Sequence, residues 1–261
     1  MKFTKKVLSA IIALCLVLCC SVPAFAASDE TATETQAYFE SYVADFRSYI
    51  DNATRTRSEK SPEQLVLDFI AAESQNYDAE MLMSVSDEET IYLDEENSIT
   101  LDGIMIYVHG TDEVEATPDR IAKGAIDVNA NTRSATSVTS IRSFYHAVYA
   151  LILGQEVYRI TQEAQFTYDG STVYANYADG YYDRGFLTVW QVSDFEDSQE
   201  STYNGGARVK SSANFHYGLE INGVGLVIQD KHCWVDARCT KNGSVSGFCD
   251  GGHKDPIFDI L

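Results

Sequence analysis

The sequence predicts an α+β protein in which a small, acidic, helix-containing N-terminal unit is followed by an antiparallel β-sandwich or barrel-like domain. Apolar residues recur at spacings of three and four between residues 35 and 70, which is typical of amphipathic helices. From residue 131 onward, β-prone runs alternate with Asn-Gly and Asp-Gly pairs, which favour tight hairpins. With 261 residues, 45% of them hydrophobic, the chain has enough apolar material for a sizeable core.

Residues 1–26 are predicted to be a signal peptide. Three lysines precede an apolar run at residues 7–20, which is shorter than the roughly 20 residues needed to span a bilayer. Ala24 and Ala26 then give the small-x-small pattern that signal peptidase cleaves. We therefore predict a secreted, extracellular protein with no stable membrane insertion after signal cleavage.

The charge is strongly negative and unevenly distributed. The chain carries 39 acidic and 19 basic side chains, a formal net charge of −20, so we expect no nucleic-acid partner, because phosphate binding needs a basic face. Residues 27–130 hold 24 acidic and 6 basic side chains, whereas residues 131–261 hold 15 and 10. This change in charge predicts a boundary near residue 131, between an acidic helical or mixed region and the β domain.

The acidic region has recognisable helix and strand signals. Ser61 is a good N-cap, Pro62 suits the first helical turn, and Gln64 is placed to complete a capping box. In order, we expect a helix at 35–50, a loop at 51–60, a buried helix from 61, a weaker helix at 77–84, and strands at 91–93 and 99–108 joined by an acidic turn.

The β domain is predicted from its turns and from the alternation between them. Residues 158–168 and 207–217 place their apolar side chains at one parity, as half-buried strands do. Residues 144–153 fit a helix or a strand, and we favour a strand. The predicted turns are Asp169-Gly170, Asp179-Gly180, Asn204-Gly205, Asn222-Gly223 and Asn242-Gly243.

Three cysteines remain after the predicted signal peptide, and outside the cell they are expected to pair. Cys233 and Cys239 would lie about 20 Å apart on one strand, too far for a disulfide. A three-residue hairpin loop at 241–243 would set Val235 opposite Cys249, so that Cys233 becomes a diagonal neighbour of Cys249. We therefore predict a Cys233–Cys249 disulfide, with Cys239 left over; the alternatives are three reduced cysteines or an intermolecular bridge.

The search for catalytic, metal and cofactor motifs gives no assignment. Serine-hydrolase, zincin, P-loop and dinucleotide motifs are missing from the sequence, so no catalytic residue, metal site or cofactor is predicted. Two alternatives stay open. One is a zinc site formed by Cys233, Cys239, Cys249 and His253. The other is an extracellular hydrolase that uses either dispersed carboxylates or Cys239 as nucleophile, with His109, His146 or His216 as base.

A group of tyrosines, with nearby acidic and tryptophan side chains, is the predicted ligand-binding site. Flat rings beside carboxylates suit sugar rings and their hydroxyls, although Tyr174 and Tyr177 have opposite parity in a regular strand. The predicted site residues are Tyr174, Tyr177, Tyr181, Tyr182, Asp183 and Trp190.

The sequence thus predicts a secreted, non-catalytic binding or interaction protein, with an extracellular glycan or a cell-surface protein as partner. The charge step at residue 131 also allows a second hypothesis. In it, the chain is a processed precursor whose acidic N-terminal region shields a C-terminal effector domain until cleavage near residues 131–133.

Overall fold

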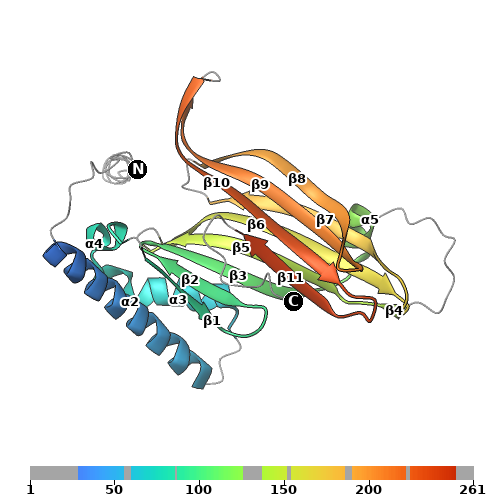
Figure 1. Ribbon diagram of the computed structural model, residues 1–261, viewed down its shortest axis with the longest axis horizontal. Helices are drawn as coiled ribbons and strands as arrows, with labels where there is room; N and C mark the ends of the chain where they lie inside the picture. The colour runs from blue at the N-terminus through green and yellow to red at the C-terminus, as the bar shows by residue number, and fades with distance from the viewer. Residues whose placement is uncertain are drawn as a thin grey trace, which may run out of the picture.

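The chain folds into a helical N-terminal part followed by two antiparallel sheets, which confirms the predicted α+β class (Figure 1). The computed structural model describes residues 29–55, 60–85, 87–125, 137–151, 154–185, 190–221 and 224–250. The predicted signal peptide and His253 lie outside these residues. In the part of the chain so described, no helix has the length and apolar character needed to cross a membrane.

The helices follow the predicted order with two corrections. Ser61 caps its helix, since its Oγ accepts a hydrogen bond from the Gln64 amide over 3.2 Å. The second half of the predicted capping box, in which the Gln64 side chain accepts from the Ser61 amide, is not formed among the described residues; Gln64 Nε2 instead donates to Asp68 over 2.7 Å. The first helix runs to Arg55, which shortens the predicted loop. The helices are α2 (Asp29–Arg55), α3 (Pro62–Glu73), η1 (Ser74–Asn76), α4 (Ala79–Met83) and α5 (Pro118–Gly124).

Seven strands form the first sheet, in the order β1-β2-β3-β5-β6, with both β4 and β7 paired to β6. Four strands form the second sheet, in the order β11-β10-β9-β8. The first sheet contains β1 (Glu88–Tyr92), β2 (Ser98–Asp102), β3 (Met105–Val114), β4 (Ser137–Val138), β5 (Ile141–Ala150), β6 (Gln155–Tyr168) and β7 (Val173–Arg184). The second contains β8 (Trp190–Tyr203), β9 (Gly206–Ile221), β10 (Val224–Cys239) and β11 (Val245–Asp250).

Glycines explain which predicted turns are right and which are wrong. Three predicted hairpin turns are confirmed, each with its glycine at positive φ: Gly170, Gly205 and Gly243. Gly103, also at positive φ, splits the predicted 99–108 strand into β2 and β3. Gly180 lies inside β7, where a Cβ would overlap Ser211, so it serves close packing between the sheets and not a turn. The turn predicted at residues 222–223 lies outside the described residues.

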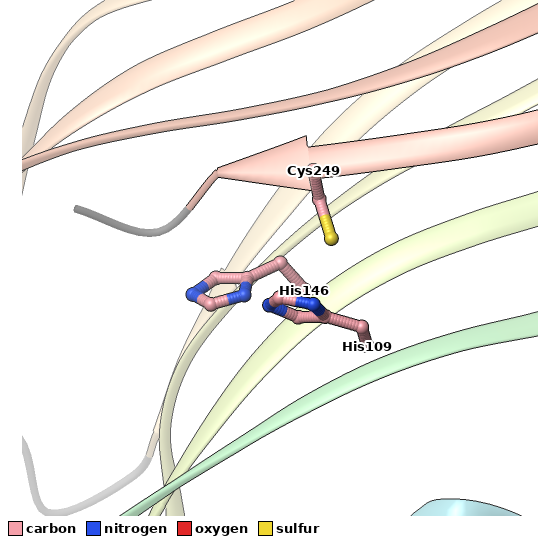
Figure 2. Close-up of side chains that lie close together, drawn as sticks. All are labelled: His109, His146 and Cys249. Carbon is pink, nitrogen blue, oxygen red and sulfur yellow. The ribbon is translucent and has the colours of Figure 1, made fainter. Parts of the chain in front are cut away.

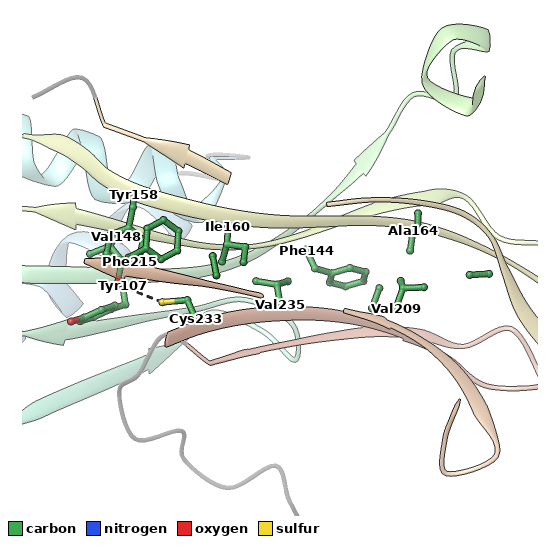
Figure 3. Packing of buried hydrophobic residues seen from close by; sticks show 14 of the residues in the cluster. Tyr107, Phe144, Val148, Tyr158, Ile160, Ala164, Val209, Phe215, Cys233 and Val235 are labelled. Atoms are coloured by element: carbon green, nitrogen blue, oxygen red, sulfur yellow. Dashed lines mark hydrogen bonds between the residues drawn. The ribbon is translucent and has the colours of Figure 1, made fainter. Parts of the chain in front are cut away.

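The two faces of the first sheet contribute to two separate cores. Alternate residues of β5, a strand as predicted, point to opposite faces. Phe144 and Val148 lie in the core between the two sheets, together with Phe215 and Val235 of the second sheet (Figure 3). The side chains of β5 on the other face contact the helices, and this core includes Tyr145, Ala147, Phe46 and Phe69.

The first sheet takes strands from both sides of the predicted boundary near residue 131. β3 precedes that position and β5 follows it, yet the two strands pair along their whole length, from Met105 opposite Ala150 to Val114 opposite Ile141. Residues 126–136 themselves lie outside the described part. The acidic helical region and the start of the predicted β domain therefore share a sheet and a core.

Candidate metal centre

Three side chains that commonly bind metals converge between the two sheets: His109, His146 and Cys249 (Figure 2). They come from β3, β5 and β11, so both sheets contribute. Taking one ring nitrogen from each histidine and the cysteine Sγ, all three atoms lie within 4.8 Å of one another.

Strand pairing brings the two histidines together. His109 of β3 lies directly opposite His146 of β5. Both point toward the second sheet, as do Tyr107 and Val148 of the same parity. The two imidazole centroids are 4.8 Å apart and the rings are inclined by 50°.

A glycine lets the third strand approach. A Cβ at Gly247 of β11 would overlap the ring of Phe144 of β5, so only glycine permits this contact. Cys249 lies two residues after Gly247, and His146 lies two residues after Phe144. Because residues two apart share a face of a strand, the close contact at Gly247 aims the Cys249 thiol at His146.

Burial differs among the three residues of the site. His146 is fully buried and stacks against Tyr107, with ring centroids 5.8 Å apart and planes inclined by 25°. Tyr107 Oη donates to Asp102 over 3.4 Å. Burial is the main cause that raises the pKa of Tyr107, so its phenol stays neutral. His109 and Cys249 are only partly buried.

The donor set suits a zinc-class ion. Zinc binds thiolate sulfur at about 2.3 Å and imidazole nitrogen at about 2.0 Å, which places tetrahedral ligand atoms about 3.3–3.5 Å apart. The ligand atoms of this cluster, all within 4.8 Å of one another, exceed that spacing by at most about 1.5 Å. Small rotations of the three side chains therefore bring them to one ion. Three protein ligands leave a fourth position for water or another donor.

The predicted strand register around the cysteines is confirmed, but the predicted disulfide is not formed. Val235 lies opposite Cys249 and Cys239 opposite Val245, as the hairpin loop implied. Among the described residues, no disulfide joins the three cysteines. Cys233 instead places its Sγ 3.8 Å from Tyr158 Oη in the core between the sheets, where burial raises the pKa of the thiol to about 12 (Figure 3).

Cys239 is also separate from the histidines. It lies at the level of Val245, four residues before Cys249, which corresponds to about 13 Å along a strand. Burial raises the pKa of the Cys239 thiol to about 11, so it is protonated at neutral pH. His216 hydrogen-bonds Ser193 Oγ through Nε2 over 2.5 Å, on strands β9 and β8. In the described structure, the Cys239 thiol is therefore not activated as a thiolate. None of the three histidines considered as its base contacts it in this part of the chain.

Two of the predicted site tyrosines meet on a buried carboxylate. Tyr177 Oη donates to Glu163 over 2.7 Å and Tyr181 Oη donates to the other carboxylate oxygen over 3.3 Å. Arg120 of α5 forms an ion pair with the same group over 2.7 Å. A β-bulge that skips Asn176 brings Tyr174 onto the same face as Tyr177, despite their opposite parity in sequence.

The other predicted site residues are not part of this cluster. Tyr182 lies on the opposite face of β7, where its ring contacts Phe195 at a centroid distance of 5.0 Å. Asp183 is exposed, and the side chain of Trp190 lies outside the described part of the chain. Because Tyr177 is buried and Tyr182 is on the other face, the structure does not unite the six predicted residues in one binding surface.

Sequence reasoning considered His109 and His146 only as possible bases for Cys239. The sequence indicates that each histidine lies on the same face of its strand as buried residues. It does not indicate that β3 pairs with β5, because a long segment joins these strands. No protein-family model, curated protein or solved structure matches this chain. Function is therefore inferred from the geometry of the site.

Proposed function

We propose that this chain is a secreted, non-catalytic binding protein whose ligand is a transition-metal ion of the zinc class. One observation supports this most directly: two imidazoles and one thiol, from three strands of two sheets, converge within 4.8 Å. Secretion enters the proposal as the prediction from residues 1–26.

The ligand chemistry favours zinc over the hard cations. Thiolate and imidazole select zinc, copper and related ions, whereas calcium and magnesium prefer oxygen ligands. Metal ligation also gives Cys249 a role other than disulfide formation. Such a role fits a cysteine that forms no disulfide in the described structure.

The ion would join the two sheets. β11 is the edge strand of the second sheet and is only six residues long, while His109 and His146 belong to central strands of the first sheet. A bound ion would therefore anchor this short edge strand to the first sheet. Because the ligands come together only in the folded chain, metal binding adds to the free energy of unfolding.

The test is a titration of the chelator-treated secreted protein with Zn²⁺ by calorimetry, and with Co²⁺ by absorption spectroscopy. We expect one ion per chain, a rise in melting temperature with Zn²⁺, and a thiolate-to-cobalt charge-transfer band. Cys249→Ser should remove this band. His109→Ala should weaken Zn²⁺ binding by more than about 100-fold. This loss is larger than that expected when a residue that only supports a metal ligand is replaced.

Matched variants separate this site from the zinc alternative seen in the sequence. Cys239→Ser and His232→Ala remove the same functional groups from residues outside the cluster, and both should bind Zn²⁺ like the wild type. Circular dichroism checks the folding of each variant. Cys249 belongs to both ligand sets, so the histidines discriminate between them: loss of binding in Cys239→Ser or His253→Ala, with binding retained in His109→Ala, would show the proposed ligand set to be wrong.

A further inference from the structure

The outer face of the second sheet carries cations interleaved with aromatic rings. We call this set the cation–ring ladder; it consists of Arg208, Lys210, Arg238, Tyr203, Trp234 and Phe248. Arg238 Cζ lies 4.0 Å from the ring centroids of both Tyr203 and Phe248. Trp234 has Lys210 Nζ at 5.0 Å and Arg208 Cζ at 5.6 Å from its centroid.

The two arginines of the ladder are held next to each other by one carboxylate. Arg208 lies directly opposite Arg238, an arrangement of like charges that destabilises a sheet. Asp236, whose side chain is fully buried, accepts through Oδ2 from Arg208 Nε at 2.5 Å and from Arg238 Nε at 3.0 Å. Lys210 lies opposite Asp236, and burial together with the Arg208 charge lowers its pKa. Two arginines therefore share one central carboxylate, and a lysine lies on the strand position opposite it.

The arginines keep donors for a further acceptor. In the described structure, Arg208 donates only through Nε, and Arg238 only through Nε and Nη2. Both terminal nitrogens of Arg208 and Nη1 of Arg238 thus donate to no described group. The two side chains are partly exposed, at 23% and 15%. A guanidinium fork of this kind matches a planar carboxylate.

Hydroxyl and amide side chains stand beside the ladder in successive rows of the sheet. Ser201 lies opposite Arg208, Ser246 opposite Arg238, Gln199 opposite Lys210 and Ser212 opposite Trp234. The surface is a sheet face and not an open edge, so it offers no backbone pairing to a peptide strand. Guanidinium forks, rigid apolar rings and hydroxyl groups together fit a ligand that combines carboxylates, apolar C–H surfaces and many hydroxyls.

We propose that the cation–ring ladder binds an acidic polysaccharide through its uronate carboxylates. Acidic side chains are present at one end, where Glu196 and Asp250 lie near Lys210. The acidic helical region lies beyond the first sheet (Figure 1). Stacked sheets are about 10 Å apart, and charges are screened beyond about 8 Å at physiological salt. The arginine pair is therefore largely screened from the acidic helical region, despite the net charge of −20.

The test compares two forms of one polymer. The secreted protein is titrated at physiological salt with polygalacturonate and with the same polymer after full methyl esterification, which neutralises its carboxylates. We expect binding to the first and at least tenfold weaker binding to the second. Arg208→Lys keeps the charge but removes the fork, and should weaken binding by about tenfold. Arg47→Lys, on α2, is the matched control and should have no effect.

A second variant distinguishes loss of the binding site from loss of the fold. Arg208→Gln combined with Asp236→Asn removes the arginine without leaving a buried, uncompensated carboxylate, and it should also lose binding. Equal binding of the esterified polymer, or full binding by Arg208→Lys, would overturn the proposal. Equally tight binding of poly-glutamate would overturn the polysaccharide assignment, and so would self-association that Arg208→Lys abolishes. Cys249→Ser should retain polygalacturonate binding, which separates this proposal from the metal site.

Discussion

Phe248 and Cys249 are consecutive residues of β11 that point to opposite faces of the second sheet. The Phe248 ring contacts Arg238 on the outer face, while the Cys249 thiol faces His109 and His146 between the sheets. Because a one-residue slip would exchange these faces, both sites depend on the register of β11. The hairpin that begins at Thr240 sets this register, with the Thr240 amide donating to the Ser244 carbonyl over 3.0 Å.

Gly247→Ala should displace β11 from β5 and weaken Zn²⁺ binding. The new Cβ would overlap the Phe144 ring, and this overlap should move Cys249 away from the histidines. The expected loss is at least tenfold in Zn²⁺ affinity, together with about 1–3 kcal/mol of stability, as is usual for overpacking. Calorimetric titration and chemical denaturation measure the two effects.

Two companion variants make the Gly247 result specific. Ser246→Ala changes a residue on the other face of β11 and should leave Zn²⁺ affinity unchanged. Phe144→Val, combined with Gly247→Ala, removes the ring that the new Cβ meets and should restore part of the affinity. Unchanged Zn²⁺ binding in Gly247→Ala would contradict the role assigned to this close approach.

The three described cysteines should differ in reactivity toward maleimide at pH 8. Cys233 and Cys239 are buried, and burial raises the pKa values of their thiols to about 12 and about 11. Because only the thiolate reacts, both should be modified at least 100-fold more slowly than an ordinary exposed thiol. Cys249 is partly exposed and should react first.

Peptide mass spectrometry after timed labelling identifies the modified cysteine. Added Zn²⁺ should protect Cys249, while unfolding the protein in denaturant should make all three cysteines react alike. Rapid labelling of Cys233 in the native protein would contradict the burial described here. Loss of both Cys233 and Cys249 from labelling, restored by reductant, would reinstate the disulfide predicted from the sequence.

Alkaline pH should destabilise the protein partly through Cys233. Burial raises the pKa of this thiol from 9.0 to about 12, so the folded state favours the neutral form. Its contribution to stability is complete below about pH 9 and is lost as the pH rises toward 12, with a slope approaching 1.4 kcal/mol per pH unit. Cys233→Ala should show a shallower loss in urea denaturation measured across this range. Ser211→Ala, a buried change without titration, should keep the wild-type slope.

Cleavage near residues 131–133 should not release the acidic N-terminal region. β3 and β5 pair along ten residues on the two sides of that position, and Tyr145 and Ala147 pack with Phe46 and Phe69. A specific protease site placed at 131–133 should give two fragments that elute together in size-exclusion chromatography and separate only in denaturant. Separation under native conditions would instead support the precursor hypothesis.

Much of the local structure was readable because it depends on neighbouring residues. The Ser61 cap and the hairpin ending in Gly243 were predicted from a few adjacent side chains, and a short loop fixes the register of its own strands. The same reasoning misread Gly180, since the demand for a small residue there comes from Ser211 on the other sheet. Local patterns do not distinguish a glycine needed for a turn from one needed for packing.

The sequence by itself determined the fold class, the order of most elements and the pairing of β10 with β11. Only the tertiary structure decided that Cys249 meets His109 and His146 and that Cys233 faces Tyr158. The first arrangement requires β3 to pair with β5 across a long connection and β11 to pack on the facing sheet. Contacts of this kind follow from the packing of distant segments around a common core, and the periodicity of a single strand carries no information about its distant partners.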